Sequence, residues 1–342
     1  MPKRALLVGI NSYKHAAKLA GCLADAKVMS ERLERHKDGK PNYECRVLLD
    51  SLEDGTPLTR AALQAVCREL FEDFKGAVLF YFSGHGVLTT AGGYLCTFDA
   101  TQDDWGVPMQ EIVQMALASP ARDILLILDC CHSGDMANPA LLNVQRMSDP
   151  LAVLREDMTV IAASHGTQVA VEAGGHGLFT AAVLDALDGG AADHLGWVTA
   201  PAIYAYVERR FGSWDQRPIY KAHTTGVTVV RECEPLIDRL KLHKLPEVFP
   251  TPDFKYPLDP EYEPEDEHGN LHEPVIPEKV AIAQLFKSYR DAGLLKATVP
   301  GEQFFWTARR SHTVELTPRG HEYWWLVQNK KVAVIGYGSQ GH

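Results

Sequence analysis

The chain has 342 residues, of which 46% are hydrophobic and 23% are charged, a balance typical of globular proteins with a sizeable core. Its formal net charge of -10 argues against nucleic acid as the main partner, because phosphate binding needs clustered Lys and Arg. The apolar run Ala5–Ile10 is too short for a secretory signal or a membrane span, so we expect a cytoplasmic protein. Seven cysteines without paired spacing argue against a disulfide framework and leave room for a reactive thiol.

The first 231 residues alternate short apolar runs with amphipathic stretches, the pattern of strand-helix-strand units and a mostly parallel sheet. We predict strands at 5–10, 45–49, 77–82, 124–128, 158–163 and 227–230. Helices are expected at about 20–35, 59–74, 108–117, 179–187 and 200–211. The continuous apolar runs indicate strands covered by helices on both faces. The fold class is therefore α/β, a three-layer sandwich.

Residues 232–277 differ sharply from this pattern. They carry a net charge of -8 and nine of the 20 prolines, a composition that cannot bury enough apolar surface to fold alone. We interpret them as a linker, or as a strap that lies on the surface. They join a first domain, 1–231, with a net charge of -6, to a final part, 278–342, with a net charge of +4.

The final part becomes regular again. A helix is expected at Glu278–Ala292, followed by strand-like runs at Phe304–Trp306 and His312–Leu316 and by a last helix that begins after Thr317. Residues 301–328 resemble the wing and final helix of a winged-helix module, so 278–330 is predicted to be a small regulatory module.

The tail, 331–342, is similar to the first strand and phosphate loop of ketol-acid reductoisomerase. A glycine-rich loop of this kind binds a dinucleotide only when it opens a helix within a complete crossover unit. We therefore assign no cofactor to the tail and reject an oxidoreductase.

Two strands of the predicted sheet end in reactive side chains, which lie at the same edge of the sheet if the two strands are neighbours. The strand at 77–82 runs into Ser83, Gly84, His85 and Gly86, and the strand at 124–128 runs into Asp129, Cys130 and Cys131. Ligands and substrates of such sheets bind beyond the carboxyl ends of the strands. A thiol becomes a nucleophile as thiolate, and a nearby imidazole is the base that produces it. A single buried Cys or His is more often structural, but two at corresponding strand ends favour catalysis.

These two motifs resemble the signatures of the metacaspases and their prokaryotic caspase-like relatives. Further matches lie in 6–11, 19–26 and 177–180. The resemblance implies a cysteine endopeptidase in which Cys131 is the nucleophile and His85 its general base. Cys130 then points into the core or a neighbouring loop. The backbone N–H groups of Gly86 and Cys131 would bind the oxyanion.

The resemblance also implies a substrate class. The positions that form the S1 pocket of metacaspases are occupied here by Cys22, Asp25, Ser83 and Asp129. Two carboxylates in a narrow pocket pair with a guanidinium or ammonium, so we expect protein substrates with Arg or Lys at P1, the residue before the scissile bond.

No zinc spacing is present, and we predict no metal cofactor. The acidic group of Asp99, Asp103 and Asp104 leaves calcium open, although a solvated turn explains it equally well.

The relatives suggest a signal-activated effector in stress, antiviral defence or cell death, with the final module binding an activating ligand or partner. The alternative is a catalytically silent caspase-like scaffold, against which the intact His85 and Cys131 argue.

Overall fold

The computed structural model describes residues 1–50, 57–89, 92–101, 103–130, 154–163, 172–173, 176–211, 217–265, 268–271 and 275–332. It divides into two compact units, Met1–Glu234 and Pro235–His342. The division falls next to the predicted boundary at Arg231. Among the helices in the described ranges, none has both the length and the apolarity needed to cross a bilayer.

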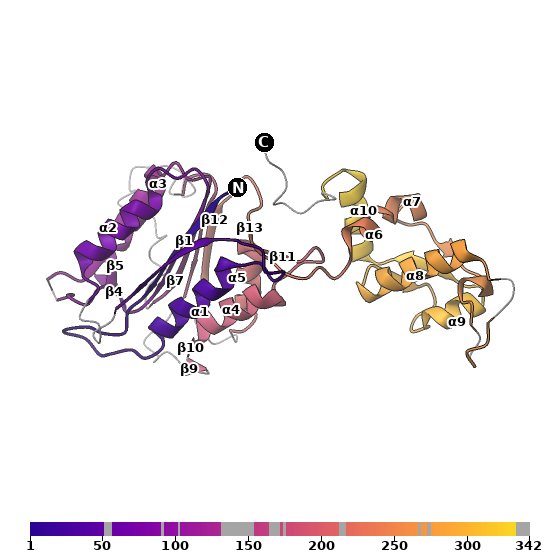
Figure 1. Ribbon diagram of the computed structural model, residues 1–342, viewed down its shortest axis with the longest axis horizontal. Coiled ribbons are helices and arrows are strands. Elements are labelled where there is room, and N and C mark those ends of the chain that lie inside the picture. The colour runs from indigo at the N-terminus through magenta and orange to yellow at the C-terminus, as the bar shows by residue number, and fades with distance from the viewer. Residues whose placement is uncertain are drawn as a thin grey trace. The chain divides into compact units, whose positions relative to one another are not determined.

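The first unit is built on a six-stranded sheet with the order β12-β8-β7-β3-β1-β2 (Figure 1). All neighbours pair in parallel except β12, which runs antiparallel to β8. In this order the strands are β12 (Ile219–His223), β8 (Met158–Ala162), β7 (Asp123–Asp129), β3 (Ala77–Ser83), β1 (Lys3–Gly9) and β2 (Glu44–Leu49). The predicted α/β sandwich with a mostly parallel sheet is thus confirmed.

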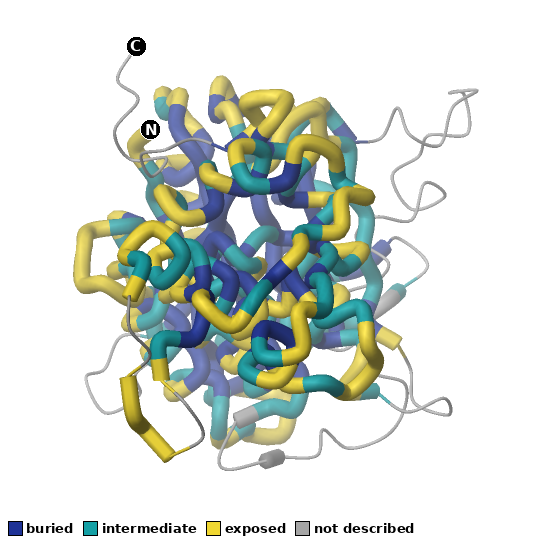
Figure 2. Tube along the Cα trace, turned by 90° about the vertical axis from the view of Figure 1, so that its right-hand side faces the viewer, coloured by how far each residue is buried: buried dark blue, intermediate teal, exposed yellow. Residues whose placement is uncertain are grey.

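Helices cover both faces of this sheet (Figure 1) and enclose two apolar cores, and Figure 2 colours the buried residues of the chain dark blue. One core lies under α2 (Arg60–Phe71) and α3 (Met109–Ala118). The other lies under α1 (Cys22–Glu34), α4 (Leu178–Asp185) and α5 (Ala200–Glu208). Successive side chains of β1 and β3 alternate between the two cores, which is why their sequences are continuously apolar.

Smaller elements complete the first unit. A three-stranded antiparallel sheet follows β3, and two further strand pairs lie nearer the end of the unit. They are β4 (Gly86–Thr89), β5 (Gly92–Cys96), β6 (Gly106–Pro108), β9 (Glu172–Ala173), β10 (His176–Gly177), β11 (Trp197–Thr199), β13 (Val229–Glu232) and the π-helical turn η3 (Ala186–Gly190) that continues α4.

The last strand of the sheet differs from the sequence prediction. The strand expected at 227–230 is β13, which pairs with β11 outside the central sheet. The sixth strand is instead β12, whose side chains are all only partly buried and include Lys221 and His223. An edge strand packed in this way lacks the apolar run that revealed the others.

The second unit contains five helices and a small antiparallel sheet with the order β14-β16-β15 among its described residues. Its elements are α6 (Arg239–His243), α7 (Leu245–Val248), β14 (Tyr256–Pro257), the 3-10 turn η4 (Pro260–Tyr262), α8 (Pro277–Asp291), β15 (Leu295–Ala297), α9 (Phe304–Arg309), β16 (Thr313–Leu316) and α10 (Pro318–Gln328). Phe286 is the centre of its core, and its ring centroid lies 4.9 to 6.4 Å from those of Phe249, Tyr256, Tyr289 and Phe304.

Two expectations for this unit were wrong. The acidic, proline-rich segment 232–277 is no mere linker, because it supplies α6, α7 and β14 and buries Leu242, Leu245 and Phe249 in the second unit. The run Phe304–Trp306 is helical, not extended; its aromatic residues favoured strand by propensity, but burial of Phe304 against Phe286 decides its conformation. The winged-helix interpretation stays a prediction, and the tail beyond Val332 lies outside the described residues.

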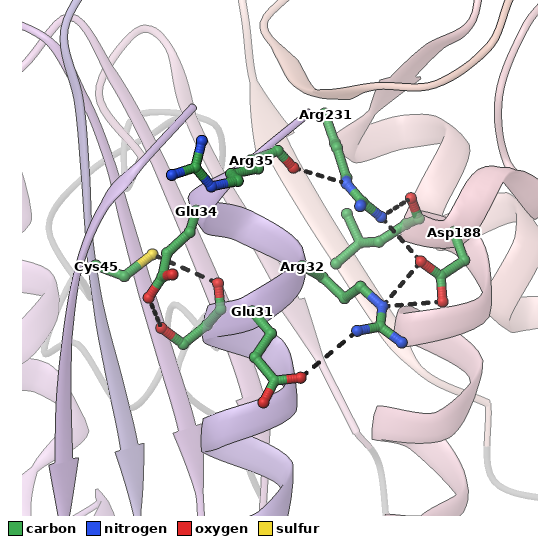
Figure 3. Close-up of polar contacts among 9 residues, drawn as sticks. Glu31, Arg32, Glu34, Arg35, Cys45, Asp188 and Arg231 are labelled. Carbon is green, nitrogen blue, oxygen red and sulfur yellow. Dashed lines mark hydrogen bonds and ion pairs between the residues drawn. The ribbon is translucent and has the colours of Figure 1, made fainter. Parts of the chain in front are cut away.

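The buried side chain of Arg231, near the end of the first unit, forms hydrogen bonds with the C-terminal end of α1 and with η3 (Figure 3). Its Nη1 donates to the Leu187 carbonyl at 2.8 Å and to Asp188 Oδ1 at 2.9 Å. Its Nε donates to the Arg35 carbonyl at 3.1 Å. Asp188 also accepts from Arg32 Nε at 3.0 Å. The strand that leads to the second unit is therefore held by a hydrogen-bonded ion pair.

We expect Arg231→Met to lower the free energy of unfolding by about 3 kcal/mol, because Asp188 and two carbonyls lose a donor. Burial opposes ionisation of Asp188, but hydrogen bonds from Arg32 and Arg231 outweigh it and lower the pKa of its carboxyl. The stabilisation is therefore complete above the unfolded aspartate pKa of about 4 and is lost as the pH falls through the folded pKa.

Urea unfolding at pH 7 and pH 3 measures the free energies of unfolding of the wild type and the variant. The difference between the two proteins should be smaller at pH 3. The matched control is Arg210→Met, which removes the partly exposed partner of Asp185 and should cost less than about 0.5 kcal/mol. Equal losses in the two variants would contradict the role of Arg231.

Candidate active site

The pairing of β3 with β7 brings the two sequence motifs together. Ser83 is the register partner of Asp129, and the N–H of Gly84 donates to the Asp129 carbonyl at 3.3 Å. His85 and Cys130 therefore leave adjacent strands at the same edge of the sheet. Cys130 is 3% exposed and belongs to the core under α2 and α3, one of the two places expected for it. Cys131 lies outside the described residues, so its role as nucleophile stays a prediction.

His85 is held by contacts from the segment that follows β1. Its backbone N–H donates to Tyr13 Oη at 2.7 Å, and Tyr13 Oη in turn donates to the Ile10 carbonyl at 3.1 Å. The Tyr13 and His85 rings lie 4.6 Å apart. The Nε2 of His85 lies 2.9 Å from the Ala17 carbonyl oxygen.

This last contact indicates which imidazole nitrogen carries the proton. A carbonyl oxygen only accepts hydrogen bonds, so the contact requires the proton on Nε2. In the neutral ring, Nδ1 then carries the lone pair that can take a proton from a thiol. The Ala17 carbonyl and Tyr13 orient this ring, and the sequence did not predict either. A backbone carbonyl leaves no trace in side-chain identity, and Tyr13 lies far from both motifs along the chain.

The four predicted S1 residues gather in one place beside these strand ends. Asp25, in the first turn of α1, is 2% exposed, and its Oδ2 accepts from Ser83 Oγ at 3.2 Å. Ser83 is paired in register with Asp129. The Cys22 thiol lies against Ser83 and within electrostatic reach of both carboxylates. The structure thus brings together side chains that are up to 107 positions apart in the sequence.

The start of α1 is positioned by β1 and by Asn11. The Oδ1 of Asn11 accepts from the Cys22 N–H at 3.0 Å, which replaces a side-chain cap at the preceding Gly21. Gly9 is required for this approach, since a Cβ at that position would lie 2.3 Å from the Cys22 carbonyl oxygen. Burial raises the pKa of the Cys22 thiol to about 12; Ser83 opposes the rise, and Asp25 and Asp129 add to it. Cys22 therefore lines this site as a neutral thiol, and we do not expect it to act as a second nucleophile.

The structure also describes the expected oxyanion donor and two residues of the acidic group. Gly86, the expected oxyanion donor next to His85, opens β4 and pairs with Leu95. Asp104 forms an ion pair of 2.5 Å with Arg60 Nη1, and Asp99 accepts from the Arg60 N–H at 3.0 Å. Arg60 thus gives part of the acidic group a structural partner. No group of three metal-ligating side chains occurs in the part of the chain that the structure describes, and calcium binding stays a hypothesis.

A three-layer sandwich with a histidine and a cysteine motif at adjacent strand ends has the architecture of the caspase-like cysteine peptidases. The model of the caspase domain family matches residues 2–229, which is more than half of the chain. The chain belongs to this family of cysteine peptidases.

Several metacaspases are similar to this chain. Metacaspase-2 of Trypanosoma brucei brucei is 32% identical over 149 residues, which cover 39% of this chain and 42% of the relative. Metacaspase-3 of Trypanosoma cruzi is 33% identical over 153 residues, or 39% of this chain and 40% of the relative. Metacaspase-4 of Arabidopsis thaliana is 28% identical over 155 residues, or 41% and 35%. The chain thus spans less than half the length of each of these relatives.

We expect Cys131→Ala and His85→Ala each to reduce peptide hydrolysis by at least about a thousandfold. Folding should be retained, because His85 follows the end of β3 and Cys131 comes two positions after the end of β7 in the sequence. Cys130→Ala should keep most of the activity. Circular dichroism checks the fold, and iodoacetamide alkylation with peptide mapping identifies the reactive thiol. Cys22 should stay unlabelled near pH 8, since its pKa is about 12. Label on Cys130 in place of Cys131 would show that the nucleophile is misassigned.

Proposed function

We propose that the chain is an active cysteine endopeptidase that cleaves proteins after Arg or Lys. The observation that carries the proposal is the gathering of Asp25 and Asp129 around Ser83, directly beside the His85 motif. Two carboxylates are the natural partners of a guanidinium or ammonium, and they repel an acidic P1 side chain. The names of the related metacaspases support the peptidase class.

The proposed reaction uses the residues of the site in a set order. A P1 cation enters the site formed by Cys22, Asp25, Ser83 and Asp129 and places the scissile carbonyl near Cys131. Nδ1 of His85 takes the thiol proton, and the thiolate attacks the carbonyl carbon to form a tetrahedral oxyanion. The backbone N–H groups of Gly86 and Cys131 would stabilise this oxyanion. His85 then gives its proton to the leaving amine, and water hydrolyses the acyl enzyme.

We propose further that the enzyme is a signal-activated effector in stress, antiviral defence or cell death, and that it works in the cytoplasm, where thiols stay reduced. The second unit would bind an activating small molecule or protein partner. Its exposed Trp306 and Trp325, which are 38% and 53% accessible, favour contacts with protein or a ligand over nucleic acid.

The first prediction concerns specificity. We expect Asp25→Asn to reduce kcat/KM for Arg and Lys peptides by an amount that corresponds to about 2–5 kcal/mol, because the substrate cation loses a buried partner. A fluorogenic peptide library, assayed with the full chain with and without calcium, measures cleavage after each P1 residue. Glu69→Gln removes one negative charge from the exposed ion pair with Arg46 and serves as the control. Equal turnover of Asp and Arg peptides by the wild type would refute the assigned specificity.

The second prediction concerns regulation. A chain that ends at Glu234 keeps β13 and all of the first unit but lacks the second. We expect its basal activity, or its response to an activating ligand, to differ from that of the full chain, as for a tethered sensor. Steady-state kinetics of the two proteins make the comparison. Identical kinetics, together with tight and salt-sensitive DNA binding by the full chain alone, would instead make the second unit a targeting module.

A further inference from the structure

A buried threonine at the start of α4 contacts one of the two S1 carboxylates. Thr180 lies in the first turn of this helix and is fully buried. Its Oγ1 donates to Asp129 Oδ2 at 2.6 Å. The approach is close, because a Cβ at Gly177, the residue before the helix, would lie 2.9 Å from the same carboxylate oxygen. The start of α4 is therefore fitted around Asp129.

The direction of the next hydrogen bond follows from proton counting. Tyr81 Oη lies 2.6 Å from Thr180 Oγ1, and either hydroxyl could donate. An ionised carboxylate only accepts, so the single hydroxyl proton of Thr180 is committed to Asp129. Tyr81 must then donate to Thr180. Burial and the charges of Asp129 and Asp25 raise the pKa of Tyr81 well above its ordinary value, so this donor keeps its proton.

Both acids of the pocket, Asp25 and Asp129, therefore depend on hydroxyl groups of the same strand, β3. Tyr81 and Ser83 are two residues apart on β3 and point to the same face of the sheet. Ser83 donates directly to Asp25, and Tyr81 acts on Asp129 through Thr180. Two carboxylates in one partly dry site repel each other, and a hydrogen bond donated to each carboxylate offsets part of this repulsion.

We propose that Thr180 is a positioning residue for S1 specificity: its hydroxyl, oriented by Tyr81, holds the Asp129 carboxylate fixed for pairing with a P1 guanidinium or ammonium. The inference rests on the proposed basic specificity and deepens it. Thr180 acts through Asp129 and touches neither the thiol nor the imidazole. Its loss should weaken cation binding while the reactivity of the His85–Cys131 pair is retained.

The test uses the full chain and the isosteric variant Thr180→Val. Agmatine, which carries the guanidinium chain of arginine without a peptide, should slow alkylation of Cys131 by iodoacetamide in the wild type. In Thr180→Val the agmatine concentration needed for half protection should rise about tenfold, as for loss of one charge-assisted hydrogen bond. The alkylation rate without agmatine should stay within about twofold, because iodoacetamide needs no S1 contact.

Three further variants distinguish the effect of the Thr180 hydroxyl from a general effect of removing a buried hydroxyl. Thr180→Ser restores the hydroxyl and should recover protection. Tyr81→Phe should have a smaller effect, about threefold, because Thr180 still donates to Asp129; it also serves if Thr180→Val fails to fold. Thr159→Val is the matched control, since it removes a buried threonine hydroxyl that is paired with Tyr220.

Unchanged agmatine protection in both Thr180→Val and Tyr81→Phe would overturn the proposal, as would a slower alkylation rate with unchanged protection. Absence of protection in the wild type would overturn it together with the basic specificity. Protection by agmatine without hydrolysis of Arg or Lys peptides would contradict the proposed peptidase activity alone and leave the role of Thr180 supported.

Discussion

The parallel register of β3 against β7 is the constraint on which the site depends. It pairs Ser83 with Asp129, so the residues that follow each strand emerge side by side. A shift of the register by one residue would send Asp129 to the opposite face of the sheet, toward the core that now contains Cys130. Such a shift is opposed at the strand ends, because it would move the Asp129 carboxylate away from its Thr180 donor and toward an apolar core.

Around these strand ends, hydroxyl groups stabilise the charge that the site concentrates. Asp25 is almost fully buried, and an isolated carboxylate in such a place would be costly. Ser83 donates to Asp25, and Thr180 donates to Asp129, so each acid has a donor within the protein. The cation of a substrate would complete the neutralisation, which links binding of a basic side chain to relief of electrostatic repulsion.

The sequence predicts the buried central strands of the first unit but not its edge strand. Strands β1, β3, β7 and β8 are buried on both faces, so their apolar runs reveal them. The edge strand β12 carries Lys221 and His223 and has no such signal. In the second unit, the aromatic run from Phe304 has strand propensity, yet tertiary packing makes it a helix. Local composition cannot report contacts that are made far along the chain.

The candidate site likewise contains residues that the sequence predicts and residues that it does not. The motifs around His85 and Asp129 are visible because each follows an apolar strand, and the resemblance to metacaspases supplied the S1 residues Cys22 and Asp25. The hydrogen bond from His85 to the Ala17 carbonyl has no side-chain signature. The chain of hydroxyls from Tyr81 through Thr180 depends on a contact across 99 positions. Such partners emerge only from the three-dimensional structure.

If Cys131 and His85 form the reactive pair of a peptidase with a basic S1 pocket, peptidyl reagents should modify Cys131 according to their P1 residue. Covalent capture tests it most directly: the full chain is incubated with peptidyl chloromethyl ketones that end in Arg or in Asp, and the modified residue is mapped by mass spectrometry. We expect one equivalent of the Arg reagent on Cys131, loss of this labelling in His85→Ala, and little labelling by the Asp reagent. Labelling of another cysteine, or equal labelling by both reagents, would contradict it.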